Sequence, residues 1–247
     1  TFLFQHFTQK KNYYNFIHFL FFHRIKAGFA VTELVKIHPK PEPLFVEMHN
    51  GIKNADDSLI RETMLQALRG VLVSNGDKLS EIMKKQIFAT LVSMLNYSED
   101  MTRLCVAGCF GSIMKWLAND PLEDALGSHI FNDDFGEDWS LRHGRTAALF
   151  VILKESPALV VNAKYETKLS KTLVSCIQNE KVNIASNGVR GSCYLIQHCQ
   201  SEGLPIPATV LTAYVKSMNH ISNEVKQLLA KTSIYLSKAL PHEKMSP

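Results

Sequence analysis

The segment that decides the fold is TRLCVAGCFGSIMKWL, residues 102–117 of the 247-residue chain. Its apolar side chains recur at the 3.6-residue period of an α-helix and fall largely on one face. The members of that face are Leu104, Ala107, Phe110, Ile113, Met114 and Leu117. Such a face is typical of packing against neighbouring helices, so we expect core residues here and no ligand pocket.

The same pattern returns along the chain at a nearly constant interval. Each copy begins with a residue pair, most often aliphatic then basic, and a long apolar-periodic helix follows it. The pairs are Ile60-Arg61, Thr102-Arg103, Leu141-Arg142, Ile184-Ala185 and Val225-Lys226. Their second members are separated by 42, 39, 43 and 41 residues. An interval of roughly 40 to 47 residues is typical of HEAT and armadillo repeats, which are built from paired α-helices.

A further helix is expected in front of each of these five. The expected spans are residues 43–53, 79–96, 121–131, 165–179 and 207–220. Residues that favour helix starts and ends stand at the expected boundaries: Pro121, Asp138 and Ser222 at starts, Gly76 and Gly203 beyond ends. No segment alternates apolar and polar residues between turns as a strand would. The sequence therefore predicts an all-α fold, an α-solenoid of about five HEAT-type helical hairpins.

Composition divides the chain into three parts. Residues 1–32 hold eight of the fourteen phenylalanines and four basic residues but no acid, so we expect an atypical N-terminal segment that is disordered or not native coding sequence. Residues 33–241 are expected to form the HEAT-repeat array, and residues 242–247 a short C-terminal tail. The four basic residues account for the whole net charge of +4, which leaves the array neutral. A neutral array argues against broad phosphate binding, so we expect no specific DNA binding.

The sequence gives no signal for membrane, metal or enzyme chemistry. No run of 18 or more apolar residues occurs, so we expect no membrane-spanning helix and no membrane partner. The five cysteines lie in apolar helical patterns, which favours buried structural thiols in a reducing compartment over disulfides or a metal site. The motifs of serine hydrolases, phosphate-binding loops, dinucleotide sites and zinc proteases are missing. We therefore expect no catalytic residues, no cofactor, no metal ion and no enzyme.

The sharpest charge feature is a junction near the middle of the chain. Seven acids and no Lys or Arg lie between Trp116 and Leu141, and a basic run follows at once. The candidate partner-binding residues of this junction are Asp133, Asp134, Glu137, Arg142, His143 and Arg145. The basic run is expected to form a turn that contacts phosphate or acidic side chains, with Gly144 allowing a close approach. The alternative, which the sequence favours, is a solvated loop whose acids stabilise the next helix and pair with its arginines.

The recurring basic position of the repeat has two interpretations. Arg61, Arg103, Arg142 and Lys226 can line the inner face and bind an acidic partner, or they can bond an acid or a helix end in the next repeat. Ala185 interrupts the series, which fits structural tolerance better than a binding code. We therefore favour the structural role.

Four strings in this register resemble a known family. They are EPLFVEMHNGI at residues 42–52, ETMLQALR at 62–69, DWSLRHGR at 138–145 and IASNGVRG at 184–191. In order and spacing they are similar to the C-terminal region of the general-control translational activator family, over roughly residues 34–240. Its members are very large cytoplasmic HEAT-repeat proteins that associate with ribosomes and help to switch on the kinase of translation initiation factor two alpha.

The resemblance implies a non-catalytic scaffold of the amino-acid starvation and ribosome-stalling response, located in the cytoplasm. The implied partners are the ribosome and the protein kinase of initiation factor two alpha, which family members bind through the RWD domain of the kinase. It also implies a fragment of a much longer protein. The repeat period alone permits a generic HEAT adaptor for transport or phosphatase-complex assembly equally well, so this alternative stays open at the level of the period.

Overall fold

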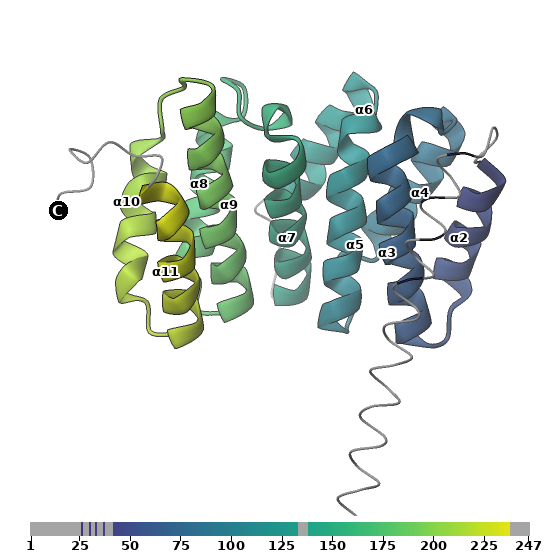
Figure 1. Ribbon diagram of the computed structural model, residues 1–247, viewed down its shortest axis with the longest axis horizontal. Helices are drawn as coiled ribbons and strands as arrows, with labels where there is room; N and C mark the ends of the chain where they lie inside the picture. The colour runs from purple at the N-terminus through teal and green to yellow at the C-terminus, as the bar shows by residue number, and fades with distance from the viewer. Residues whose placement is uncertain are drawn as a thin grey trace, which may run out of the picture. The chain divides into compact units, whose positions relative to one another are not determined.

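The computed structural model describes residues 42–132 and 138–237, together with the single positions Lys26, Ala30, Glu33 and Ile37. Within these residues all regular structure is helical, and no strand is present. The α-helices of the two continuous ranges are α2 to α11 (Figure 1). The chain divides into two compact units, Thr1–Ile87 and Phe88–Pro247. The predicted all-α solenoid of helical hairpins is confirmed.

The first unit contains a helical hairpin of α2 (Glu42–Asn54) and α3 (Ser58–Asn75), which pack against each other. Asp57 starts α3, because its carboxylate accepts hydrogen bonds from the backbone N–H groups of Leu59 and Ile60. A 3₁₀ turn, Gly76–Lys78, follows α3, and α4 (Glu81–Ser93) begins in this unit. The apolar side chains buried in the hairpin include Phe45, Ile52, Leu65, Leu68, Val71 and Leu72.

The second unit stacks the later hairpins side by side. Its longer helices are α5 (Asp100–Ile113), α7 (Trp139–Glu155), α9 (Val182–Ser201) and α11 (Asn223–Ser237). Each of these packs directly against the next (Figure 1). The partner helices are α6 (Asn119–Asp124), α8 (Glu166–Ile177) and α10 (Ala208–Lys216), and α8 packs against both α9 and α10.

Each of the ten helices expected from the sequence is present. The third partner helix departs most from expectation, since α6 starts at Asn119 and changes after Asp124 into a π-helical turn, Ala125–Ile130. Asp138 caps α7 as expected, accepting from the N–H of Ser140 at 2.9 Å. Gly203 stands beyond the end of α9 with a φ of 67°, a left-handed conformation that favours glycine.

Polar contacts join the packed helices at the period seen in the sequence. Ser112 Oγ donates to Glu155 Oε2 at 2.7 Å, across 43 residues between α5 and α7. Asn187 Nδ2 donates to Thr146 Oγ1 at 3.3 Å, across 41 residues between α7 and α9. Such separations match one repeat, so neighbouring repeats meet through residues at corresponding positions.

The segment at residues 102–117 packs largely as predicted. Ala107, Phe110, Ile113 and Met114 are buried, but Leu104 is 39% exposed and Leu117 is half-buried. The buried face of α5 instead includes Thr102, Arg103 and Val106. Two polar residues join this face because their side chains find partners inside the protein, which a pattern based only on apolar residues does not reveal.

The cysteines follow the prediction for structural thiols in four of five cases. Cys109, Cys176, Cys193 and Cys199 are buried, whereas Cys105 is half-buried, and all five are free thiols. Burial raises the pKa of the Cys193 thiol to about 11. A thiol with so high a pKa stays protonated at neutral pH and acts as a small core residue.

Candidate functional site

The first turns of α5, α7 and α9 meet at one edge of the second unit. Asp100 stands at the start of α5, Trp139 at the start of α7, and Lys181 and Asn183 at the start of α9. Asn183 Nδ2 donates to Asp100 Oδ2 at 3.1 Å, which ties α9 to α5. We call these four residues, together with Arg142, the docking edge.

Arg103 forms the buried support of the docking edge. Its side chain is fully buried, and it donates to the carbonyl oxygens of Tyr97 and Ser98 and pairs with the carboxylate of Asp100. Its Nε donates to Nδ1 of His143 at 3.0 Å. A buried guanidinium is tolerated only when its N–H groups are paired, so this network fixes the side chain in one position.

His143 is the neutral partner of that arginine. The pKa of the His143 imidazole is lowered to about 4, chiefly by burial and also by the charge of Arg103, while the charge of Asp100 opposes the shift. Nδ1 accepts a hydrogen bond, so it carries no proton, in agreement with the lowered pKa. His143 therefore serves as a structural acceptor between α5 and α7.

Trp139 presents an aromatic surface above this support. Its side chain is 43% exposed, and the guanidinium carbon of Arg103 lies 5.0 Å from the centre of its ring system. Lys181 Nζ lies 5.4 Å from the same ring system, and the His143 ring stacks on it at 6.4 Å. Cations near an indole are attracted to its face, so the exposed ring is held in place before any partner arrives.

Arg142 connects α7 to the next repeat. It is half-buried, and its Nη2 donates to Ser175 Oγ at 2.5 Å and to the Ser175 carbonyl at 3.5 Å, near the end of α8. Arg61 likewise donates to the carbonyl of Ala55, just beyond α2. The predicted bond to the next repeat is confirmed for Arg142. Arg61 departs from it, because it bonds a helix end in its own repeat.

The predicted turn at residues 142–145 is wrong. Asp138 caps α7 four residues earlier, so the whole basic run lies in the first turns of a helix. His143 and Arg145 are buried, and Arg145 Nη1 donates to the carbonyl of Asn132 at 3.4 Å. Of the three basic candidates, only Arg142 reaches the surface.

The close approach expected at Gly144 exists, but it is internal. A Cβ atom at Gly144 would lie 1.9 Å from the carbonyl oxygen of Leu95, so the backbone of α7 touches the segment that follows α4. The acidic candidates Asp133, Asp134 and Glu137 lie outside the described residues. Their pairing with the arginines therefore stays a prediction.

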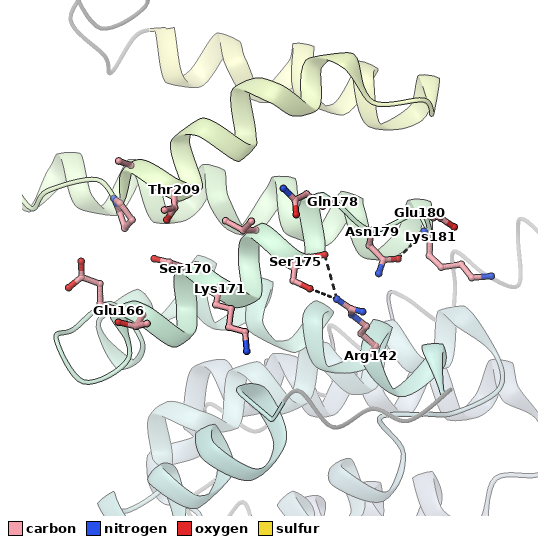
Figure 2. A pocket seen from close by; sticks show the side chains of 14 residues that line it. Arg142, Glu166, Ser170, Lys171, Ser175, Gln178, Asn179, Glu180, Lys181 and Thr209 are labelled. Carbon is pink, nitrogen blue, oxygen red and sulfur yellow. Dashed lines mark hydrogen bonds between the residues drawn. The ribbon is translucent and has the colours of Figure 1, made fainter.

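A groove with a volume of about 1030 Å³ adjoins the docking edge. Figure 2 shows its lining, which comes from α8, the turn into α9 and the start of α10, with Arg142 at one side. Lys181 lines this groove and also contacts Trp139, so the docking edge and the groove are neighbours.

Sequence reasoning missed Trp139 and Lys181. Trp139 directly follows the cap residue Asp138, and an exposed tryptophan at a helix start is a signal for a binding surface. The two side chains are 42 positions apart, and only the packing of α7 against α9 brings them together. The sequence around Lys181 gives no signal for a binding surface, because a lysine in a turn between helices is ordinarily solvated.

The chemistry of the site fits binding. In the part of the chain that the structure describes, no three His, Cys, Asp or Glu side chains are grouped as metal ligands would be. No helix within that part has the length and apolar character needed to cross a membrane. Tryptophan and arginine are enriched among the residues that dominate binding energy at protein interfaces, and both stand at this edge.

Comparison with known proteins identifies relatives of this chain. The family described as stalled ribosome sensor GCN1-like, HEAT repeats, matches residues 42–247. The chain is 34% identical over 225 residues to the stalled ribosome sensor GCN1 of Homo sapiens, which covers 91% of this chain and 8% of that protein. It is 27% identical over 167 residues to the eIF-2-alpha kinase activator GCN1 of Saccharomyces cerevisiae, which covers 67% of this chain and 6% of the yeast protein.

A solved structure of a designed armadillo repeat protein in complex with a peptide is also similar, at 14% identity and a TM-score of 0.44. The similarity covers 85% of this chain and 91% of the designed one.

The chain spans about 8% of the length of the human relative. The named relatives favour the hypothesis of translational control over that of a generic adaptor. The chain belongs to the GCN1-like family of stalled-ribosome-sensor HEAT repeats.

Proposed function

We propose that this chain is a non-catalytic scaffold segment of a cytoplasmic activator of the initiation factor two alpha kinase. The family membership of residues 42–247 supports this proposal more than any other observation. The human relative is named as a sensor of stalled ribosomes and the yeast relative as an activator of that kinase. The proposed partners are therefore the ribosome and the kinase, the latter bound through its RWD domain.

The docking edge is the proposed contact surface. Trp139 is exposed and already held by Arg103 and Lys181, so binding orders few additional side chains. Arg142 and Lys181 stand beside it as cations, which steer an acidic partner toward the aromatic ring. Asp133, Asp134 and Glu137 immediately precede α7 in sequence, and we propose that they add an acidic rim to this surface.

A pull-down with the full chain tests the proposal. Purified ribosomes and a purified RWD domain of the kinase are offered separately to immobilised wild type and to a variant with Trp139→Ala and Arg142→Ala. A control variant carries Lys216→Ala and Met218→Ala, two exposed residues in α10 and just after it. We expect wild type and control to retain at least one partner and the docking-edge variant to lose most of it.

Two results would count against the proposal, and they differ in meaning. Wild type that retains neither ribosomes nor the RWD domain contradicts the proposed function. Retention by the docking-edge variant at the level of the control removes Trp139 and Arg142 from the contact surface and leaves the family membership unaffected.

A further inference from the structure

A small apolar pocket adjoins the polar groove beside α8. It has a volume of about 160 Å³ and lies between α8, α9 and the segment that follows α9. Its lining is mainly aliphatic and includes Leu169, Leu195, Leu204 and Pro205. Drug-sized ligands occupy pockets of roughly 300 to 1,000 Å³, so this pocket is the size for a single side chain.

The pocket and the groove form one continuous surface, since Glu166 and Pro207 line both. Glu166 is the first residue of α8, and Ser175, which binds Arg142, lies near its end. The apolar pocket is therefore at the amino end of α8, and the Arg142 side of the groove is toward its carboxyl end.

Charge changes along this surface. The carboxylate of Glu166 stands next to the pocket, whereas Lys171, Arg142 and Lys181 follow further along the groove (Figure 2). Glu180 also lines the far end, beside Lys181. The surface therefore offers an apolar anchor site beside an acid at one end and a predominantly basic stretch beyond it.

The spacing of the two ends defines the length of a matching segment. An α-helix rises about 1.5 Å per residue, so the nine residue steps from Glu166 to Ser175 span roughly 14 Å. An extended chain advances about 3.3 Å per residue, so about four to five residues of peptide cover that distance.

We infer that the groove beside α8 binds an extended peptide of a partner protein, with an apolar side chain in the pocket and acidic side chains four to five residues away. The acidic side chains contact Lys171, Arg142 and Lys181. Glu166 repels a second acid next to the anchor, so the acidic side chains lie at the other end of the groove, whichever way the peptide chain runs. This inference goes beyond the proposed function, because it assigns a ligand to the groove and the pocket, which share only Arg142 and Lys181 with the docking edge.

A peptide suits the surface better than a nucleic acid strand. A strand carries a phosphate at every nucleotide and needs a continuous basic path, but Glu166 and Glu180 interrupt the path here. The apolar pocket adds a site for an aliphatic side chain, for which a nucleotide has no counterpart. Charge and pocket together therefore select a peptide.

Fluorescence polarisation with the full chain tests the inference. The probe is a labelled peptide of about eight residues with one leucine, a neutral spacer of three or four residues, and two aspartates. Because the chain direction of the ligand is not assigned, the reversed sequence is included. Matched peptides replace leucine by serine or both aspartates by lysine, and a single-stranded RNA oligonucleotide serves as the competing class of ligand.

The protein variants are chosen at exposed positions so that they fold. Lys171→Glu changes the groove, and Leu204→Gln changes the pocket, where Leu204 is 42% exposed. Lys168→Glu is the matched control, because Lys168 is exposed on the same helix but does not line the groove. Circular dichroism melts verify that each variant has the stability of wild type.

We expect one peptide direction to bind wild type in the micromolar range. Lys171→Glu and Leu204→Gln should each weaken this binding at least fivefold, and Lys168→Glu should change it by less than twofold. Absence of binding up to 1 mM for both directions would overturn the inference. Equal binding of the lysine peptide, equal loss with Lys168→Glu, or preferential binding of RNA would do the same. Any of these results leaves the pull-down with ribosomes and RWD domain standing as a separate test.

Discussion

At the residue scale, the docking edge depends on a buried polar pair that apolar periodicity does not reveal. The sequence placed Arg103 at a recurring basic position and His143 in a surface turn. The structure joins them through a 3.0 Å hydrogen bond inside the protein, 40 residues apart in sequence. A residue type cannot indicate whether its partner is water or another side chain, so this part of the site needed the structure.

Gly144 tests the close contact between α7 and the segment that follows α4. Gly144→Ala should destabilise the chain by about 3 kcal/mol or more, because the new Cβ would collide with the Leu95 carbonyl and neither backbone can move freely. Gly127→Ala is the control, since a Cβ at Gly127 meets nothing within 4 Å. Urea unfolding of both variants measures the difference. Equal stability of the two would show that α7 does not approach Leu95 so closely.

The lowered pKa of His143 predicts a pH dependence of stability. Above pH 6.5 the imidazole is neutral in the folded and unfolded chains. Between pH 6.5 and about 4 the unfolded chain binds a proton that the folded chain excludes, so stability falls as the pH falls, by up to roughly 3 kcal/mol in all from this residue. His49 and His129 also have lowered pKa values and add to the same trend.

A variant isolates the contribution of His143. In His143→Asn the amide oxygen can accept from Arg103, and the side chain does not titrate. The free energy of unfolding, measured in urea between pH 7 and pH 4, should fall less steeply for the variant than for wild type. Identical slopes would show that His143 is not held neutral in the folded chain.

At the element scale, the start of α7 decides where the basic run lies. The Asp138 carboxylate accepts hydrogen bonds from the Ser140 hydroxyl and from the backbone N–H groups of Ser140 and Leu141. The Ser140 hydroxyl contributes most to lowering the pKa of the Asp138 carboxyl, which keeps the capping group ionised. Because the helix begins here, His143 and Arg145 turn inward and Trp139 and Arg142 remain at the edge.

Asp138→Ala should remove this cap and destabilise the chain by about 1 kcal/mol. Glu99→Ala is the matched control, because Glu99 is the N-cap residue of α5 but its side chain makes no capping hydrogen bond. We expect the control to change the free energy of unfolding by less than about 0.5 kcal/mol. The measurement is thermal or urea unfolding of both variants. If Glu99→Ala destabilises the chain as much as Asp138→Ala does, the capping hydrogen bonds of Asp138 contribute no additional stability.

The helices themselves were largely predictable from the sequence. Apolar periodicity and boundary residues located all ten helices, because both signals are local. The π-helical turn Ala125–Ile130 was not predicted, since it changes hydrogen bonding without changing the apolar pattern. Leu104 was placed wrongly in the core because the helical period gives a face but not how far neighbouring helices cover it.

At the scale of the whole molecule, the fold and the binding surface differ in how far the sequence reveals them. The period near 41 residues predicted the stack of hairpins, and the quoted strings predicted the family. Of the candidate surface, Arg142 was predicted, whereas Trp139 and Lys181 were not. Lys181 Nζ lies 5.4 Å from the centre of the Trp139 ring system, although the two residues are 42 positions apart in the sequence. A single sequence gives no sign that two such residues meet.

The most direct test of the central claim is a calorimetric titration of the full chain with a purified RWD domain of the initiation factor two alpha kinase. The account predicts measurable binding by wild type. The variant with Trp139→Ala and Arg142→Ala should bind about tenfold or more weakly, and the Lys216→Ala, Met218→Ala control should bind like wild type. No heat of binding with wild type at concentrations up to 1 mM would contradict the assignment of the RWD domain as a partner, and, if the pull-down also retains no ribosomes, it would contradict the account as a whole.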